Sequence, residues 1–185
     1  MAHSVFIVVS YSGTVVSKLI KARWPEGAYA HASLALDRRL ERMYSFGRRG
    51  TYNMLNAGFI REDIERGLFA IKPVEARIYE LEATDEAYGA LEAEIDRFLK
   101  RAPELHYDGL GLVLKLANPE IELRREAHYY CSRFVAEALL ASGVVDELPA
   151  TPRLMHTTMF ADIKGATLRY EGLLSEYRKS VDSTL

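Results

Sequence analysis

The sequence has little cysteine and no excess of charge of one sign, and each shortage excludes a class of protein. It holds one cysteine among 185 residues, so neither an internal disulfide framework nor a cysteine-rich zinc site can form. A single thiol is typical of a reducing compartment. The 24 Lys and Arg residues are balanced by 26 Asp and Glu residues, whereas a broad phosphate-binding surface needs a large basic excess. We therefore expect no nucleic-acid partner.

Long hydrophobic runs are also missing. No stretch approaches the roughly 18 apolar residues that a membrane span needs, so we expect no integral membrane association. The first four residues carry no basic region, and the apolar run of residues 5–9 is too short for the core of a signal peptide. These observations predict a soluble, cytoplasmic protein. The hydrophobic fraction of 49% is enough for one core, and we expect a single domain over residues 1–185.

Hydrophobic patterning predicts strands that are interspersed with helices. The strands are expected at residues 5–9, 29–37, 43–47, 74–83 and 168–174, the second and third as an antiparallel hairpin and the fourth with a bulge at Ile78-Tyr79. Helices are expected at residues 15–23, after the capping residue Thr84, and from about Cys131 to Gly143. Residues 48–60 are expected to be irregular, and residues 110–116 fit either a strand or a helix. This order favours the α+β class over a doubly wound sheet.

Cys131 is the first candidate for chemistry. The apolar spacing after it predicts a helix that begins at or just before the thiol. In the first turn of a helix, unpaired backbone N–H groups and the helix dipole stabilise a thiolate, and the same N–H groups can hold an oxyanion. The alternative is that Cys131 is a small core residue, the usual role of a free cysteine on an apolar helix face.

A nucleophilic thiol needs a base, and histidine is the side chain best matched to neutral pH. Of the five histidines, His31 begins a run that is expected to form a central strand, so its ring can face the start of a helix. The alternative role for His31 is that of a hydrogen-bonded structural residue. The other four lie at the frayed N-terminus, in expected loops or too close to the thiol in sequence: His3, His106, His128 and His156.

Three stretches together resemble a known family. They are Tyr29-Ala30-His31-Ala32-Ser33-Leu34-Ala35-Leu36-Asp37, Tyr44-Ser45-Phe46-Gly47-Arg48 and Tyr130-Cys131-Ser132-Arg133-Phe134-Val135-Ala136. They resemble the circularly permuted NlpC-type branch of the papain-like cysteine peptidases, a superfamily that includes proteins similar to lecithin:retinol acyltransferase. The resemblance implies a papain-like α+β domain with a central antiparallel sheet packed against helices, in which the histidine strand precedes the cysteine helix.

The resemblance also implies catalytic roles. Cys131 would be the nucleophile, His31 its base, and a third polar residue on the next strand would orient the imidazole. Ser45 is the residue that we predict for this third role, although the family more often has a carboxylate, an amide or a second histidine there. Tyr44 and Asp37 are weaker candidates.

The expected activity is hydrolysis of an amide bond in a small peptide or amide, and the family's substrates include bacterial cell-wall peptides. We expect neither a metal nor an organic cofactor. Two alternatives remain open: a lipid-directed acyltransferase or thioesterase that uses the same residues, and a catalytically silent binding module. Small clusters of arginine, among them Arg38-Arg39 and Arg48-Arg49, lie in or near the predicted hairpin, where they could select a substrate carboxylate.

Overall fold

The computed structural model describes residues 3–13, 18, 22, 29–49, 57–118 and 125–183. The strands are β1 (His3–Tyr11), β2 (His31–Ala35), β3 (Met43–Arg48), β4 (Ala57–Glu62), β5 (Glu75–Ala83), β6 (His106–Tyr107), β7 (His128–Tyr129) and β8 (Thr167–Leu173). The helices are α2 (Gly67–Ile71), α3 (Asp85–Arg101), α4 (Gly109–Ala117), α5 (Cys131–Ala141), α6 (Leu174–Asp182) and a short 3₁₀ helix, η1 (Thr157–Asp162). The protein is therefore of the α+β class.

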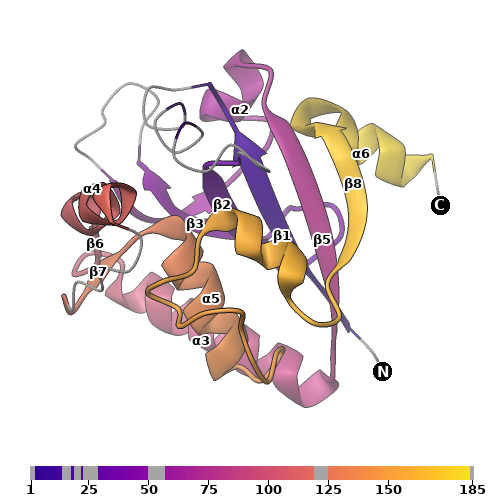
Figure 1. The fold of residues 1–185 in the computed structure, drawn as a ribbon. Coiled ribbons are helices and arrows are strands. Elements are labelled where there is room, and N and C mark those ends of the chain that lie inside the picture. Colours follow the sequence, from indigo (N-terminus) through magenta and orange to yellow (C-terminus); the bar gives the residue numbers. More distant parts are fainter. Residues whose placement is uncertain are drawn as a thin grey trace.

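Six strands form one antiparallel sheet in the order β4-β3-β2-β1-β5-β8. Helices α3 and α5 lie side by side along one face, and α6 lies against β8 (Figure 1). The short strands β6 and β7 pair in parallel as a separate sheet beside α4. Strand β2 is interior to the large sheet, between β1 and β3, so the predicted central position of the His31 strand is confirmed.

The sheet is covered on both faces, which explains the uninterrupted apolar run in β1. Val5, Ile7 and Val9 point into the larger core, together with apolar side chains of α3 and α5. Phe6 and Val8 point to the opposite face, where α6 packs. A strand that is buried on both faces has no need for alternating polar residues.

Most of the predicted elements are confirmed. Strands β2 and β3 form the expected antiparallel hairpin, β5 has a register shift between Ile78 and Tyr79 opposite β8, and Thr84 caps α3. The ambiguous segment is helix α4, which begins behind the capping carboxylate of Asp108. The helix predicted for residues 15–23 lies outside the described residues except at 18 and 22.

Part of the predicted irregular stretch was wrong, because residues 57–62 form the edge strand β4. Its residues pair along the whole of β3, from Met43 opposite Glu62 to Arg48 opposite Ala57. Gly58 concealed the strand in the sequence, because glycine is depleted in strands.

None of the helices within the described residues has the length and hydrophobicity needed to cross a membrane.

Candidate active site

Cys131 is the first residue of α5, and its thiol is buried. The preceding residue, Tyr130, has an extended backbone and makes no side-chain hydrogen bond to the first turn. Two neighbours secure this end of the helix. Ser132 Oγ donates to the Met155 carbonyl at 2.8 Å, and the buried guanidinium of Arg133 donates to the His128 carbonyl. The thiol is therefore held in place by side chains that leave the N–H groups at the start of the helix uncapped.

His31 begins β2, where it lies opposite Ser10 of β1. Its side chain is 26% exposed, and its Nε2 atom lies 2.9 Å from Oε1 of Glu62. The ring also interacts with the thiol of Cys131, and this interaction raises the pKa of His31. The structure thus places an imidazole between a thiol and a carboxylate that come from three different elements.

Glu62 is the last residue of β4, and its side chain is only 8% exposed. One carboxylate oxygen faces His31, and the other accepts a hydrogen bond from the hydroxyl of Ser33. A buried carboxylate is unfavourable unless its charge is paired and its oxygens are hydrogen-bonded, and both conditions are met here.

The surroundings of the thiol favour a thiolate–imidazolium pair. Burial by itself raises the pKa of Cys131, but the hydrogen bond and charge of His31, with the backbone N–H groups of Ala32 and Ser132, bring that pKa below its usual value. Burial lowers the pKa of His31, while the charges and hydrogen bonds of Glu62 and Cys131 raise it well above its usual value. Both shifts act in the same sense, toward an ionised sulfur and a protonated ring.

Glu62 supplies the permanent negative charge of the site. Burial raises the pKa of its carboxyl, but the charge and hydrogen bond of His31 and the hydroxyls of Ser33 and Ser45 outweigh burial and lower it. The carboxylate therefore remains ionised beside the imidazole. This is the arrangement that fixes a ring's orientation and stabilises its protonated form.

Of the three residues predicted for the site, the structure brings Cys131 and His31 together and places Ser45 differently. Ser45 is fully buried on β3, and its hydroxyl meets no partner at full hydrogen-bond geometry within the described residues. It lies near Glu62 rather than near the ring. Glu62 holds the position next to His31 that the sequence assigned to Ser45.

The two weaker candidates for the third role lie elsewhere. Tyr44 packs in the larger core, where its ring stacks on Phe59. The carboxylate of Asp37 accepts hydrogen bonds from the backbone N–H groups of Glu41 and Arg42, which shape the connection between β2 and β3. Both residues serve the hairpin and its packing.

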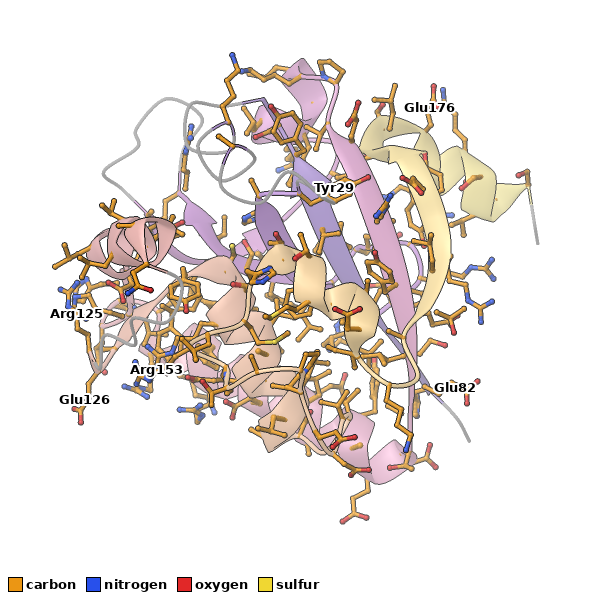
Figure 2. All side chains as sticks on the ribbon, viewed as in Figure 1. Tyr29, Glu82, Arg125, Glu126, Arg153 and Glu176 are labelled. Atoms are coloured by element: carbon orange, nitrogen blue, oxygen red, sulfur yellow. The ribbon has the colours of Figure 1, made fainter. Side chains whose placement is uncertain are left out.

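The other histidines have partners of their own. His3 lies 3.0 Å from the carboxylate of Asp85, and His156 Nδ1 lies 2.5 Å from the hydroxyl of Thr158. The ring of His106 is tilted against that of His128, with the ring centroids 5.3 Å apart. The fifth, His128, contacts Arg125, which is at the surface beside α4 (Figure 2). His31 is the histidine that interacts with the thiol, as the shifted pKa values of both groups show.

Only part of the predicted arginine cluster lies near the site. Arg39 and Arg42 are at the far end of the hairpin, paired with Asp182 and Glu92. Arg48 ends β3 and, because β2 and β3 are antiparallel, lies at the same end of the sheet as His31. Burial, and then the charge of Cys131, raise the pKa of Tyr107, while the charge of Arg48 lowers it, so both charges lie near that ring.

Glu62 is the functional candidate that the sequence did not reveal. It lies 31 residues after His31, beyond the stretch that was expected to be irregular. A Glu that follows the short run Gly58–Arg61, in which the two apolar residues are adjacent, gives a weak strand signal, and only the pairing of β4 with β3 brings it to the sheet. The sequence carried no local motif for this contact.

Comparison with known proteins adds no assignment. No protein-family model matches the sequence, and no curated protein matches it significantly.

The arrangement has the parts that nucleophilic chemistry needs: a sulfur whose pKa is lowered, an imidazole beside it and a carboxylate 2.9 Å from the imidazole. The backbone N–H groups at the start of α5 are positioned to stabilise negative charge next to the sulfur. Within the residues that the structure describes, no group of three or more His, Cys, Asp or Glu residues could hold a metal ion.

Proposed function

We propose that the protein is a cysteine-dependent amidase or peptidase in which Cys131 is the nucleophile, His31 the acid–base group and Glu62 the orienting carboxylate. The observation that carries the proposal is the place of the imidazole, which lies 2.9 Å from a buried carboxylate and close enough to the thiol for each group to shift the pKa of the other. A structural histidine needs one good partner, whereas this ring is held between an acid and a nucleophile.

We assign the fold to the permuted NlpC-type branch of the papain-like superfamily. Three features support this assignment: the antiparallel sheet, the histidine at the start of an interior strand and the cysteine at the start of a helix that packs on that sheet. The histidine strand precedes the cysteine helix in the chain, which is the order expected of the permuted branch. Glu62 as the third residue brings the site closer to the family pattern than Ser45 does.

In this mechanism the Cys131 thiolate attacks the carbonyl carbon of the amide, and the carbonyl oxygen becomes an oxyanion near the N–H groups that start α5. The intermediate collapses, the C–N bond breaks and the His31 imidazolium gives its proton to the leaving amine. A thioester to Cys131 remains. His31, now neutral, takes a proton from water, the hydroxide attacks the thioester, and the acid product leaves with the thiolate and imidazolium restored.

The test is the rate at which iodoacetamide alkylates Cys131 between pH 4 and 9. The sulfur is the chain's one thiol, so mass spectrometry assigns the adduct without ambiguity. We expect a reactive plateau that extends well below the pKa of about 8.5 of a free thiol. His31→Ala should remove the low-pH reactivity, because the thiolate loses its imidazolium.

His3→Ala is the matched control, since His3 also contacts a group at the start of a helix, but that group is Asp85 of α3. It should leave the profile unchanged. A Cys131 that reacts only as a free thiol does, or a profile that survives His31→Ala in the folded protein, would overturn the proposal. Turnover is then sought with a panel of amide and ester substrates, wild type beside Cys131→Ser.

A second function has one observation in its favour, namely that α4 presents apolar side chains to solvent. Leu110 is 56% exposed and Val113 is 61% exposed, and the helix directly follows Tyr107, which lies near Cys131. An apolar surface at this place could receive an acyl chain, as a lipid-directed thioesterase or acyltransferase requires.

p-Nitrophenyl acetate and p-nitrophenyl octanoate separate the two functions. An acyl-directed enzyme should prefer octanoate at least tenfold in kcat/KM and lose the preference in Leu110→Gln/Val113→Gln. An amidase should show no dependence of the octanoate-to-acetate ratio on this double substitution.

A further inference from the structure

The buried polar residues of the sheet gather at one place on one face. Side chains alternate along β2, so His31 and Ser33 share a face while Ala32 and Leu34 point into the larger core. The rest of that face is apolar and packs against α6. Polar groups buried in such surroundings are costly unless they have partners, so their presence beside Glu62 calls for a reason.

Ser33 has a specific contact there. It is 1% exposed and donates its hydroxyl proton to the Glu62 oxygen that does not face His31. A glutamate side chain can rotate about three bonds, and its carboxylate must present one oxygen to the ring. With one oxygen bound by Ser33 and the other by His31, the carboxylate plane is fixed from both sides.

We infer that Ser33 is a positioning residue of the active site: its hydroxyl holds the Glu62 carboxylate against His31, and through His31 it sustains the reactive form of Cys131. The inference rests on the proposed function, since it concerns the same thiol. Ser33 itself touches neither the sulfur nor a substrate. Its place two residues after His31 on the same strand couples its position rigidly to that of the ring it serves.

One other hydroxyl, that of Ser45, lies close to the Glu62 carboxylate. A Cβ at Gly47 would lie 3.5 Å from Oε1 of Glu62 and 3.3 Å from Oγ of Ser45. Ser45 is the nearest other hydroxyl, but it makes no full hydrogen bond in the described structure. Ser33 is therefore the residue whose loss frees the carboxylate to turn from His31.

The test is again the pH profile of Cys131 alkylation by iodoacetamide. Ser33→Ala should move the low-pH midpoint upward by roughly half to one pH unit, because a mobile, less acidic Glu62 stabilises the imidazolium less. Ser33→Thr and Ser33→Val differ by a hydroxyl at nearly equal volume. We expect Thr to keep the wild-type midpoint and Val to shift it as Ala does.

Two further variants test whether Ser33 acts on Cys131 through Glu62. In a Glu62→Gln background, Ser33→Ala should add little further shift, since the group it acts on is already gone. Ser142→Ala removes another buried hydroxyl, one that bonds to the Ala138 carbonyl at the far end of α5. It should lower stability without moving the profile.

A Ser33→Ala protein that is folded and keeps the wild-type midpoint would overturn the inference, and so would equal midpoints for Thr and Val. A full additional shift in the Glu62→Gln background would also overturn it. These outcomes differ from failure of the proposed function, in which wild-type Cys131 itself shows no lowered midpoint and His31→Ala changes nothing.

Discussion

Helices α3 and α5 lie side by side on one face of the sheet, yet they begin in opposite ways. At α3 the hydroxyl of Thr84 accepts a hydrogen bond from the Ala87 N–H at 3.1 Å, and Asp85 and Glu86 occupy the first turn. At α5 no side chain caps the helix and no acidic residue lies in the first turn. In that position stands Cys131.

The difference shows what each helix end is for. Free N–H groups and the helix dipole favour a negative charge, and α3 has its own side chains to satisfy them. At α5 no side chain satisfies them, and under the proposed function they stabilise the thiolate and the oxyanion of the reaction. Helix α3 has a capping side chain and α5 has none. The missing cap is consistent with a lower stability at the start of α5 that leaves its N–H groups available for chemistry.

Removing the charge of Glu62, which acts on Cys131 through His31, is expected to have the largest effect on the reactivity of the thiol. Glu62→Gln keeps the shape of the side chain but removes the charge beside His31, so the imidazolium is less stable. We predict a tenfold to hundredfold fall in the rate of Cys131 alkylation at pH 6, the usual size for a lost orienting partner.

Glu92→Gln is the control from α3, where that carboxylate pairs with Arg42 at the surface. It should leave the alkylation rate within about twofold, because exposed ion pairs contribute little. Equal effects of the two substitutions would mean that Glu62 acts through general stability rather than through the ring.

The second prediction concerns how the contribution of Cys131 to the free energy of unfolding depends on pH. Because the folded pKa of Cys131 is lowered, the native state binds fewer protons than the unfolded state between that pKa and about 8.5. Stability from this group is therefore fully present above about pH 8.5 and is lost as the pH falls through the folded pKa. Urea unfolding of wild type and Cys131→Ala should show a difference that rises with pH in this window, by at most about 1.4 kcal/mol per pH unit. A difference that is flat or falls with pH would contradict the lowered pKa.

At the start of α3, Thr84→Ala should change stability in a way that does not depend on pH. The loss of its capping bond should cost about 1 kcal/mol of unfolding free energy, and the cost should not vary between pH 6 and 9 because a hydroxyl does not titrate there. Cys131 alkylation should be unchanged. An altered alkylation profile would show that the two helix starts are coupled, contrary to the comparison.

The sequence predicts those parts of the structure that are encoded by residues close together in the chain. Patterns that are local in the chain were sufficient for β1, for the hairpin of β2 and β3, and for α3 with its Thr84 cap. The start of α5 at Cys131 was also local, since the apolar spacing that follows the thiol fixes the helix face. These elements could be read from spacing alone.

The third member of the site could not be predicted in the same way. Ser45 was the best candidate on the neighbouring strand, and it does lie close to the site, but the carboxylate comes from β4, one strand further away. Gly58 and the irregular composition before it hid that strand. Register across two strand pairs is a long-range property, and no residue near His31 encodes it.

The smallest expected effect concerns the charge that faces each helix start. Asp85 and Glu86 surround the start of α3 with negative charge, whereas Arg48 and Cys131, the first residue of α5, both lie near Tyr107. A cation there should favour reagents that carry a carboxylate. The ratio of alkylation rates for iodoacetate and iodoacetamide should therefore fall about twofold to threefold in Arg48→Gln at low salt, with the iodoacetamide rate nearly unchanged. Arg42→Gln, at the far end of the hairpin, should leave the ratio as it is. If both substitutions change the ratio equally, the preference for the charged reagent comes from the net charge of the protein and not from the position of Arg48.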